Sequence, residues 1–210
     1  MLAVLKKDLI LLISNKRELI FMLFYIPFLI FTVDSYDPKM LYFTIIVTFA
    51  YFTSLSSFYH DIDGKGKYIL NSLPITARRI VLYKYASIFF HLVISIVYAG
   101  IYLWIINLAG ITIVDYFNIE MIFKAIPIVM LIISIIFPAY ILFEPRIAQI
   151  INMLVFLGFL IGMVNLGALG EKSFIKMIGI FQGNSLTYLA IIMYLLSLLL
   201  SMVLYQKKDL

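Results

Sequence analysis

The sequence predicts an all-α integral membrane protein with six transmembrane helices. Its composition is the first reason, because 64% of the 210 residues are hydrophobic and only 13% are charged. Soluble domains contain about 45–50% apolar and about 25% charged residues. So few charges could not cover a surface in water. The second reason is a series of long uncharged stretches, and the third is an uneven distribution of Lys and Arg between the segments that join them.

The uncharged stretches are long enough to define the spans. A helix needs about 20 apolar residues to cross a hydrocarbon core of about 30 Å. Stretches free of Asp, Glu, Lys and Arg cover 19–33, 40–60, 85–114, 125–143, 147–170 and 177–206. We expect one transmembrane domain over 1–210, with spans at 19–35, 40–60, 85–108, 125–143, 147–166 and 185–206. The excess between the last two spans, 167–184, is predicted to form a re-entrant segment on the outer side.

The distribution of basic residues predicts the orientation. Cytoplasmic loops carry an excess of Lys and Arg. If the N-terminus is inside, the inner segments hold Lys6, Lys7, Lys16, Arg17, Lys65, Lys67, Arg78, Arg79, Lys84, Arg146, Lys207 and Lys208, whereas the outer loops hold only Lys39, Lys124, Lys172 and Lys176. Both termini are therefore predicted to be cytoplasmic. The formal net charge of +5 is explained by these loops, and no nucleic-acid-binding motif accompanies it.

Residues 1–18 are predicted to form an amphipathic helix in the cytoplasmic interface. At 100° per residue, one face gathers apolar residues and the other polar ones. The apolar face is Leu2, Leu5, Leu9, Leu12 and Ile13, and the polar face is Lys6, Lys7, Ser14, Asn15, Arg17 and Glu18. The alternative is a simple extension of the first span.

The longest polar connection is the cytoplasmic loop 61–84. Pro74 would end a short helix over 67–73, and Thr76 is placed to cap a helix beginning at Ala77. We expect Arg78, Arg79 and Lys84 to anchor that helix at the inner headgroups. The short helix would expose Tyr68, Ile69, Leu70 and Leu73, which indicates a docking surface. The alternative is a solvated basic connector.

The sequence contains no motif for catalysis or nucleotide binding. Its two histidines, His60 and His91, lie in different spans without a metal-binding pattern, and we interpret both as interfacial residues. Residues 64–67 are not a phosphate-binding loop, which requires GxxxxGK followed by Ser or Thr. No charged residue lies within the six stretches, which disfavours an ion-coupled transporter.

Two spans could line a path for an amphipathic substrate. The second carries a mildly polar face with Thr44, Thr48, Tyr51, Ser54 and Ser57, and the fifth carries Asn152, Phe156, Phe159 and Met163 at helical spacing. The candidate path residues are Thr48, Tyr51, Asn152, Phe156, Phe159 and Met163. The alternative is ordinary helix packing, to which the Gly158–Gly162 pair would contribute close approach.

The segment 73–85, LPITARRIVLYKY, resembles a segment of ABC-2-type permeases, the membrane subunits of ATP-binding-cassette exporters. The resemblance extends to the plan of interfacial helix, six spans, long loop after the second span and outer segment before the sixth. It implies that the 61–84 loop contains a coupling helix that contacts a separate ATPase subunit through Lys65, Lys67, Tyr68, Ile69, Leu70 and Leu73.

The resemblance also implies partners and a location. Two copies of the chain would assemble with two ATPase chains in a bacterial plasma membrane. ATP and Mg would bind to the partner, and this chain would bind no cofactor. The short, very apolar chain is similar to the exporters of phenol-soluble-modulin peptides.

The leading function is therefore the permease subunit of an ATP-driven exporter of amphipathic or hydrophobic peptides or lipid-like molecules. The alternative is the six-span substrate-binding component of an ATP-driven vitamin importer, although the outer loops are short and poor in polar groups. An intramembrane enzyme is disfavoured by the missing catalytic residues.

Overall fold

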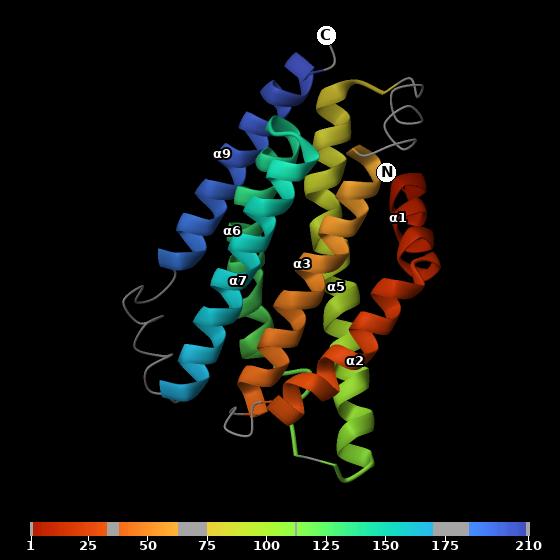
Figure 1. The fold of residues 1–210 in the computed structure, drawn as a ribbon, viewed down its shortest axis with the longest axis vertical. Coiled ribbons are helices and arrows are strands. Elements are labelled where there is room, and N and C mark those ends of the chain that lie inside the picture. The colour runs from red at the N-terminus through yellow and green to blue at the C-terminus, as the bar shows by residue number, and fades with distance from the viewer. Residues whose placement is uncertain (1, 33–37, 63–74, 112, 170–184, 209–210) are drawn as a thin grey trace.

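The computed structural model describes residues 2–32, 38–62, 75–111, 113–169 and 185–208. These residues form α1 (Leu2–Ser14), α2 (Lys16–Thr32), α3 (Pro38–Ile62), α5 (Ala77–Leu108), α6 (Ile119–Leu142), α7 (Pro145–Leu169) and α9 (Ser185–Lys208), and the described part of the chain contains no strand. The longer helices run side by side in one bundle (Figure 1). The all-α prediction is confirmed.

Five of the described helices, α3, α5, α6, α7 and α9, are long and apolar enough to cross a membrane. The apolar part of α2 is shorter and covers Leu19–Ile30. Such a stretch does not reach across a hydrocarbon core of about 30 Å by itself. Five helices therefore agree with predicted spans in length and composition, and the crossing of the membrane by six helices stays a prediction.

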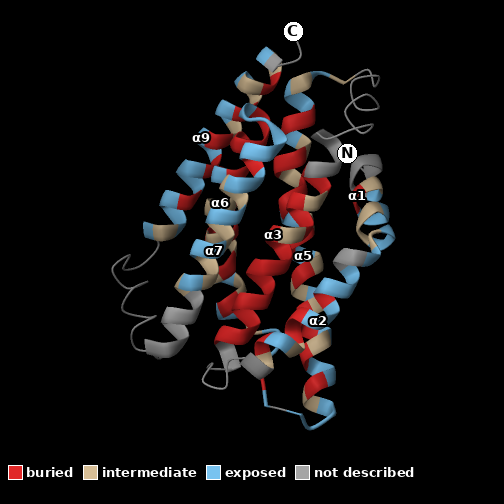
Figure 2. Ribbon diagram, in the orientation of Figure 1, coloured by how far each residue is buried: buried red, intermediate tan, exposed pale blue. Residues whose placement is uncertain are grey.

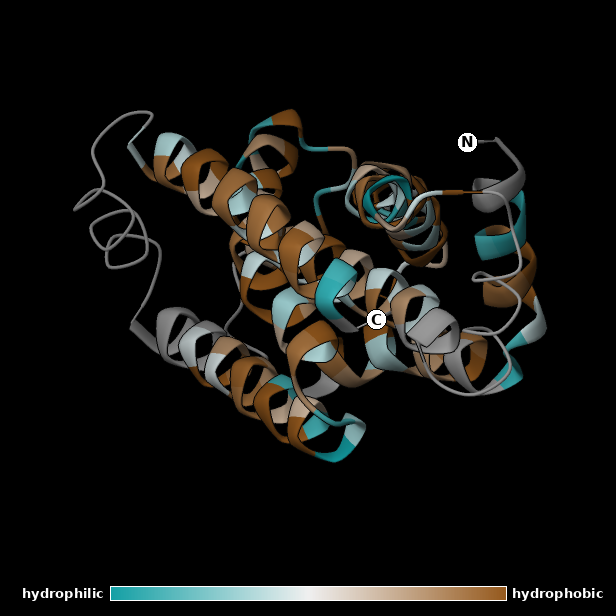
Figure 3. Ribbon diagram, turned by 90° about the horizontal axis from the view of Figure 1, so that it is seen from above, coloured by the Kyte–Doolittle hydropathy of each residue, from teal (hydrophilic) through white to brown (hydrophobic). Residues whose placement is uncertain are grey.

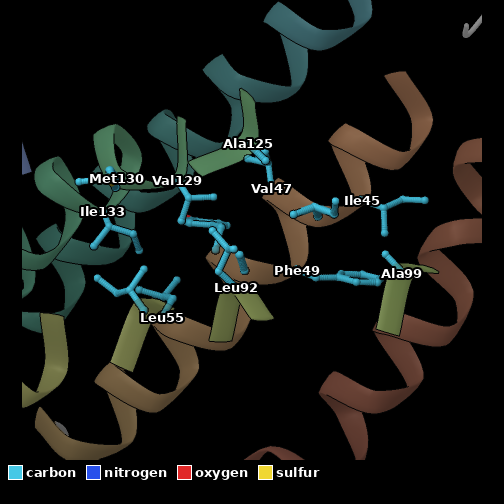
Figure 4. Packing of buried hydrophobic residues seen from close by; sticks show 14 of the residues in the cluster. Ile45, Val47, Phe49, Leu55, Leu92, Ala99, Ala125, Val129, Met130 and Ile133 are labelled. Carbon is cyan, nitrogen blue, oxygen red and sulfur yellow. The ribbon is translucent and has the colours of Figure 1, made fainter. Parts of the chain in front are cut away.

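The central helix of the bundle is α3. It is buried along nearly its whole length, as the red ribbon in Figure 2 shows, and it packs against both α5 and α6. Val47 of α3 lies near Ala125 of α6, and Phe49 points toward Ala99 of α5 (Figure 4). The apolar core therefore forms where α3, α5 and α6 meet. In contrast, few of the described residues of α7 and α9 are buried, as expected for helices that face lipid.

The connections alternate between the two ends of the bundle. The start of α1, the end of α3, the start of α5, the α6–α7 connection and the end of α9 lie toward the same end (Figure 1). Seen from above, the hydrophilic ribbon segments include α1, the start of α5, the α6–α7 connection and the end of α9 (Figure 3). This arrangement agrees with basic segments gathered at one end, and the assignment of that end to the cytoplasm stays a prediction.

The helix α5 is longer than the span predicted at 85–108. It begins at Ala77, where the Thr76 carbonyl oxygen accepts hydrogen bonds from the N–H groups of Arg79 and Ile80. Thr76 holds the predicted N-cap position with extended backbone, but its hydroxyl makes no cap bond, so the expected side-chain cap is wrong. At the other end of α5, the side-chain amide of Asn107 donates a hydrogen bond to the Val114 carbonyl oxygen at 2.7 Å and accepts one from the Val114 N–H at 2.9 Å. These two bonds hold the connection to α6 in place.

Two predicted segments lie mainly outside the described residues. The residues expected to contact an ATPase, Lys65, Lys67, Tyr68, Ile69, Leu70 and Leu73, all fall within 63–74. Most of the expected re-entrant segment 167–184 falls within 170–184. Its first residues belong to α7, because that helix continues to Leu169 instead of ending near residue 166.

The N-terminal helix α1 is a separate element, interrupted from α2 at Asn15, and it packs beside α3 and α5. Part of its predicted apolar face points away from the bundle, which is compatible with an interfacial helix, and its place in the interface stays a prediction. Leu9 and Ile13 of the expected apolar face are exposed, whereas Asp8 is buried. The reason is electrostatic, since the inward direction brings Asp8 beside a buried lysine of α5.

Candidate functional site

The predicted substrate path brings together an amide and several aromatic rings between α3 and α7. The Tyr51 hydroxyl donates a hydrogen bond to Asn152 Oδ1. The Tyr51 ring stacks on Phe156 with centroids 5.7 Å apart and an interplanar angle of 8°. Phe52 meets Phe156 edge-on at 5.0 Å. Helical spacing explains the convergence, because Asn152 and Phe156 are four residues apart on one face of α7.

These side chains border a small apolar cleft. It is lined by Val47 and Tyr51 of α3, Ile132 of α6, and Val155, Phe156 and Phe159 of α7, which pack so closely that no water-sized space remains between them. No charged side chain belongs to this lining. The aromatic residues of α7 are half-buried, so the cleft lies at the border between the core and the outer surface of the bundle. Such a surface suits the apolar part of a ligand, and the Tyr51 hydroxyl, which is bonded to Asn152, is the polar side-chain group of its lining.

The structure places four of the six predicted path residues together, namely Tyr51, Asn152, Phe156 and Phe159. Thr48 points elsewhere, because its hydroxyl lies 3.2 Å from the Tyr25 hydroxyl of α2. The side chain of Met163 lies outside the described residues. The hydroxyl groups of α3 therefore meet several neighbours rather than forming one polar wall.

Gly158 and Gly162 were predicted to allow close approach of another helix, but no helix in the described part of the chain packs against them. A Cβ atom added at either position would meet no atom within 4 Å. The neighbouring α7 residues Met153, Leu154 and Ile161 are also exposed. This surface of α7 is open to lipid or to another molecule.

A buried charged cluster lies where α1, α3 and α5 meet, and the sequence did not indicate it. Lys84 Nζ lies 3.6 Å from Asp8 Oδ1, and the two side chains are 5% and 0% exposed. Lys84 also donates to the backbone oxygen of Ser57 at 3.1 Å and to its hydroxyl at 2.9 Å. His91 Nε2 lies 4.0 Å from Asp8 Oδ2, and Lys7 Nζ lies 3.5 Å from Asp8 Oδ1.

This cluster corrects two predictions. Lys84 is not a headgroup anchor, because it is buried against α1 and α3; Arg78 and Arg79 are exposed, and their role as anchors stays a prediction. His91 is not interfacial, because it is 1% exposed and faces Asp8. The side chain of His60 lies outside the described residues. The only signal in the sequence was the spacing of seven between Lys84 and His91, which puts both on one face of a helix.

A second buried polar network joins α5, α6 and α9. The Tyr85 hydroxyl lies 2.7 Å from Ser197 Oγ and 2.8 Å from Ser201 Oγ. Ser197 also donates to the Ser134 carbonyl oxygen at 2.7 Å, and the Tyr194 hydroxyl donates to the Tyr85 carbonyl oxygen at 2.7 Å. These bonds connect α9, which is otherwise widely exposed, to the core of the bundle.

The bundle of long apolar helices defines a multi-pass membrane protein. Within that class, a family model described as "ABC-2 family transporter protein" matches residues 3–206, and the chain therefore belongs to the ABC-2 family of transporter proteins. The match includes α1 and almost all of α9, so it covers the whole bundle. No curated protein and no solved structure matches the chain. The resemblance seen in segment 73–85 is confirmed at the level of the family, and the chain is a membrane component of an ABC transporter.

Proposed function

We propose that the chain is the permease subunit of an ATP-driven exporter of amphipathic or hydrophobic peptides or lipid-like molecules. The observation that supports this substrate class is the apolar cleft among α3, α6 and α7, which is lined by aromatic rings beside the Tyr51–Asn152 hydrogen bond. A peptide or lipid with one apolar side finds apolar contacts there and few polar partners. A water-soluble vitamin requires several fixed polar groups, so the vitamin importer is the weaker alternative.

The energy source that we propose is a separate ATPase subunit. Residues 65–73 would form the coupling helix, with Lys65, Lys67, Tyr68, Ile69, Leu70 and Leu73 at the contact, and ATP and Mg would bind to the partner. The position of this segment supports the assignment, because α5 begins at Ala77 and continues without a break to Leu108. A displacement of the segment by the ATPase would therefore be transmitted to the interior of the bundle through one continuous helix. We propose two copies of the chain with two ATPase chains.

Phe159→Ala tests the substrate path. In vesicles that contain the permease and its ATPase, we expect export of a fluorescent amphipathic peptide to fall about tenfold, which corresponds to about 1.4 kcal/mol. ATPase copurification should not change, because Phe159 belongs to α7 and is not part of the proposed coupling segment. Leu154→Ala is the matched control, since it removes an exposed apolar side chain from the same helix. Equal effects of the two variants on export would contradict the path.

Tyr68→Ala combined with Leu70→Asp tests the coupling segment. Aromatic anchors in protein interfaces contribute about 2 kcal/mol or more when truncated, and a buried unpaired carboxylate adds a further penalty. We expect the double variant to insert normally and to lose copurification with the ATPase. Lys substitutions at the exposed Arg78 and Arg79 serve as the control and should leave the association intact. Retained association and ATPase stimulation in the double variant would show that the contact lies elsewhere.

A further inference from the structure

The carboxylate of Asp8 is buried where α1 meets α3 and α5. The Asp8 side chain is fully buried, and neither of its oxygens has a hydrogen-bond partner among the described residues. Both ring nitrogens of His91 and the hydroxyl oxygen of Ser54 are also without such a partner there. The charge of Asp8 is balanced by Lys84 and Lys7, at 3.6 Å and 3.5 Å.

Buried ion pairs contribute little to stability compared with apolar residues of similar size, because both charges lose their hydration. Such a pair instead favours one arrangement of the two helices over others, because a buried charge that loses its partner is strongly destabilising. An Asp8–Lys84 pair therefore favours one position of α1 on α5 over other positions that apolar packing alone would allow. Leu9, Ile10 and Ile13 point away from the bundle and do not fix this position.

The contacts of Lys84 allow it to transmit a movement of α5 to α1. It lies seven residues, about two helical turns, inside α5 from Ala77. Its ammonium group is held on α3 by the carbonyl and hydroxyl of Ser57, and on α1 by Asp8. The helix α1 is separated from α2 at Asn15, where the regular helix is interrupted.

We propose that Asp8 and Lys84 act as positioning residues that make α1 follow α5 during transport, with Ser57 holding the Lys84 ammonium group on α3. The pair would transmit a displacement of the start of α5 to the N-terminal helix. This inference rests on the proposed function, because it assumes that an ATPase acts on the segment before α5.

The test asks whether the charges of Asp8 and Lys84, and not only the space that their side chains fill, are needed for transport. In Asp8→Leu/Lys84→Met both charges are replaced by apolar side chains, so no buried charge is left unpaired and the variant is expected to fold. Asp8→Glu keeps the charge and serves as the conservative variant. A matched control, Glu120→Gln/Lys124→Met, removes an exposed ion pair of 2.6 Å at the start of α6. Each variant is assayed in the complex with its ATPase for ATP hydrolysis and for peptide export.

We expect the apolar double variant to bind the ATPase and hydrolyse ATP while export per ATP falls about tenfold, within the range of coupling between two sites. The single variant Asp8→Glu should retain most of the wild-type export per ATP. The Glu120→Gln/Lys124→Met control should behave like the wild type. A purely structural role would instead lower thermal stability and ATPase association together. Wild-type export per ATP in the apolar double variant would overturn the proposal.

A distance measurement keeps the inference separate from the proposed function. The chain has no cysteine, so Ile10→Cys and Leu82→Cys introduce unique labelling sites on exposed positions of α1 and α5. Spin labels at these sites should give a narrow distance distribution in the otherwise unaltered chain, with or without trapped nucleotide, and a broad one in the apolar double variant. Identical distributions would overturn the positioning role even if no ATPase binds. If the otherwise unaltered chain binds no ATPase, but the distance distribution is still broader in the apolar double variant, only the proposed function would be overturned.

Discussion

Tyr85→Phe measures how strongly the hydroxyl network attaches α9 to the rest of the bundle. The substitution removes a fully buried hydroxyl that lies 2.7 Å from Ser197 Oγ and 2.8 Å from Ser201 Oγ, and it keeps the ring. The ring contacts with Phe137 and Tyr194, each at a centroid distance of 5.2 Å, should therefore persist. Only the hydrogen bonds are tested.

The magnitude follows from the two bonds. Interhelical hydrogen bonds in membrane proteins contribute about 0.6 kcal/mol each on average, so their loss amounts to about 1 kcal/mol. Ser197 retains its bond to the Ser134 carbonyl oxygen, whereas Ser201 loses its contact with Tyr85. A buried hydroxyl left without a partner adds about 1 kcal/mol. We expect Tyr85→Phe to lower the free energy of unfolding by about 1–2 kcal/mol.

Unfolding in mixed detergent micelles can be followed by the fluorescence of Trp104, the one tryptophan of the chain. A double-mutant cycle with Ser201→Ala isolates the pairwise energy, because Ser201→Ala should cost less in the Y85F background than in the wild type. Leu199→Ala, an exposed position on the same helix, is the control for changes at the lipid surface. An unchanged unfolding free energy in Tyr85→Phe, or additive effects in the cycle, would refute the reasoning.

Two further predictions concern the connection between α5 and α6. A Cβ atom at Gly100 would overlap the ring of Phe117, whose backbone has a left-handed φ of 53°, so Gly100→Ala should displace that ring and destabilise the fold by about 1 kcal/mol, measured by the same fluorescence assay. Asn107→Ala removes both hydrogen bonds to Val114, and hydrogen exchange at the Val114 amide should become about fivefold faster, as expected for a loss of about 1 kcal/mol. Unchanged stability in the first variant, or unchanged exchange in the second, would contradict these contacts.

The helix boundaries were largely predictable because charged and polar residues flank the apolar stretches. The start of α5 at Ala77 followed from Pro74 and Thr76, and the described helices match the predicted spans within a few residues at most of their ends. Lys84 shows where this reasoning fails. A lysine at the end of an apolar stretch indicates an anchor when it is considered alone, and its burial depends on Asp8, which is far away in the sequence.

The candidate path was predictable in part. The spacing of Asn152, Phe156 and Phe159 identified one face of α7, because helical periodicity is a local property. Which residue of α3 meets that face is a property of packing. Tyr51 does so, whereas Thr48, three residues before it, meets Tyr25 of α2. Periodicity grouped the two α3 residues on one face, but the surrounding helices separate their roles.

The central place of α3 has a consequence for biosynthesis. Its polar side chains acquire partners from segments that leave the ribosome at different times. Thr48 meets Tyr25, which is already synthesised; Ser57 receives Lys84 only when α5 emerges, and Tyr51 must await Asn152 of α7. A nascent chain that ends before α7 would therefore hold a Tyr51 hydroxyl without its native acceptor, so the polar pairing of α3 is completed only after α7 has been synthesised.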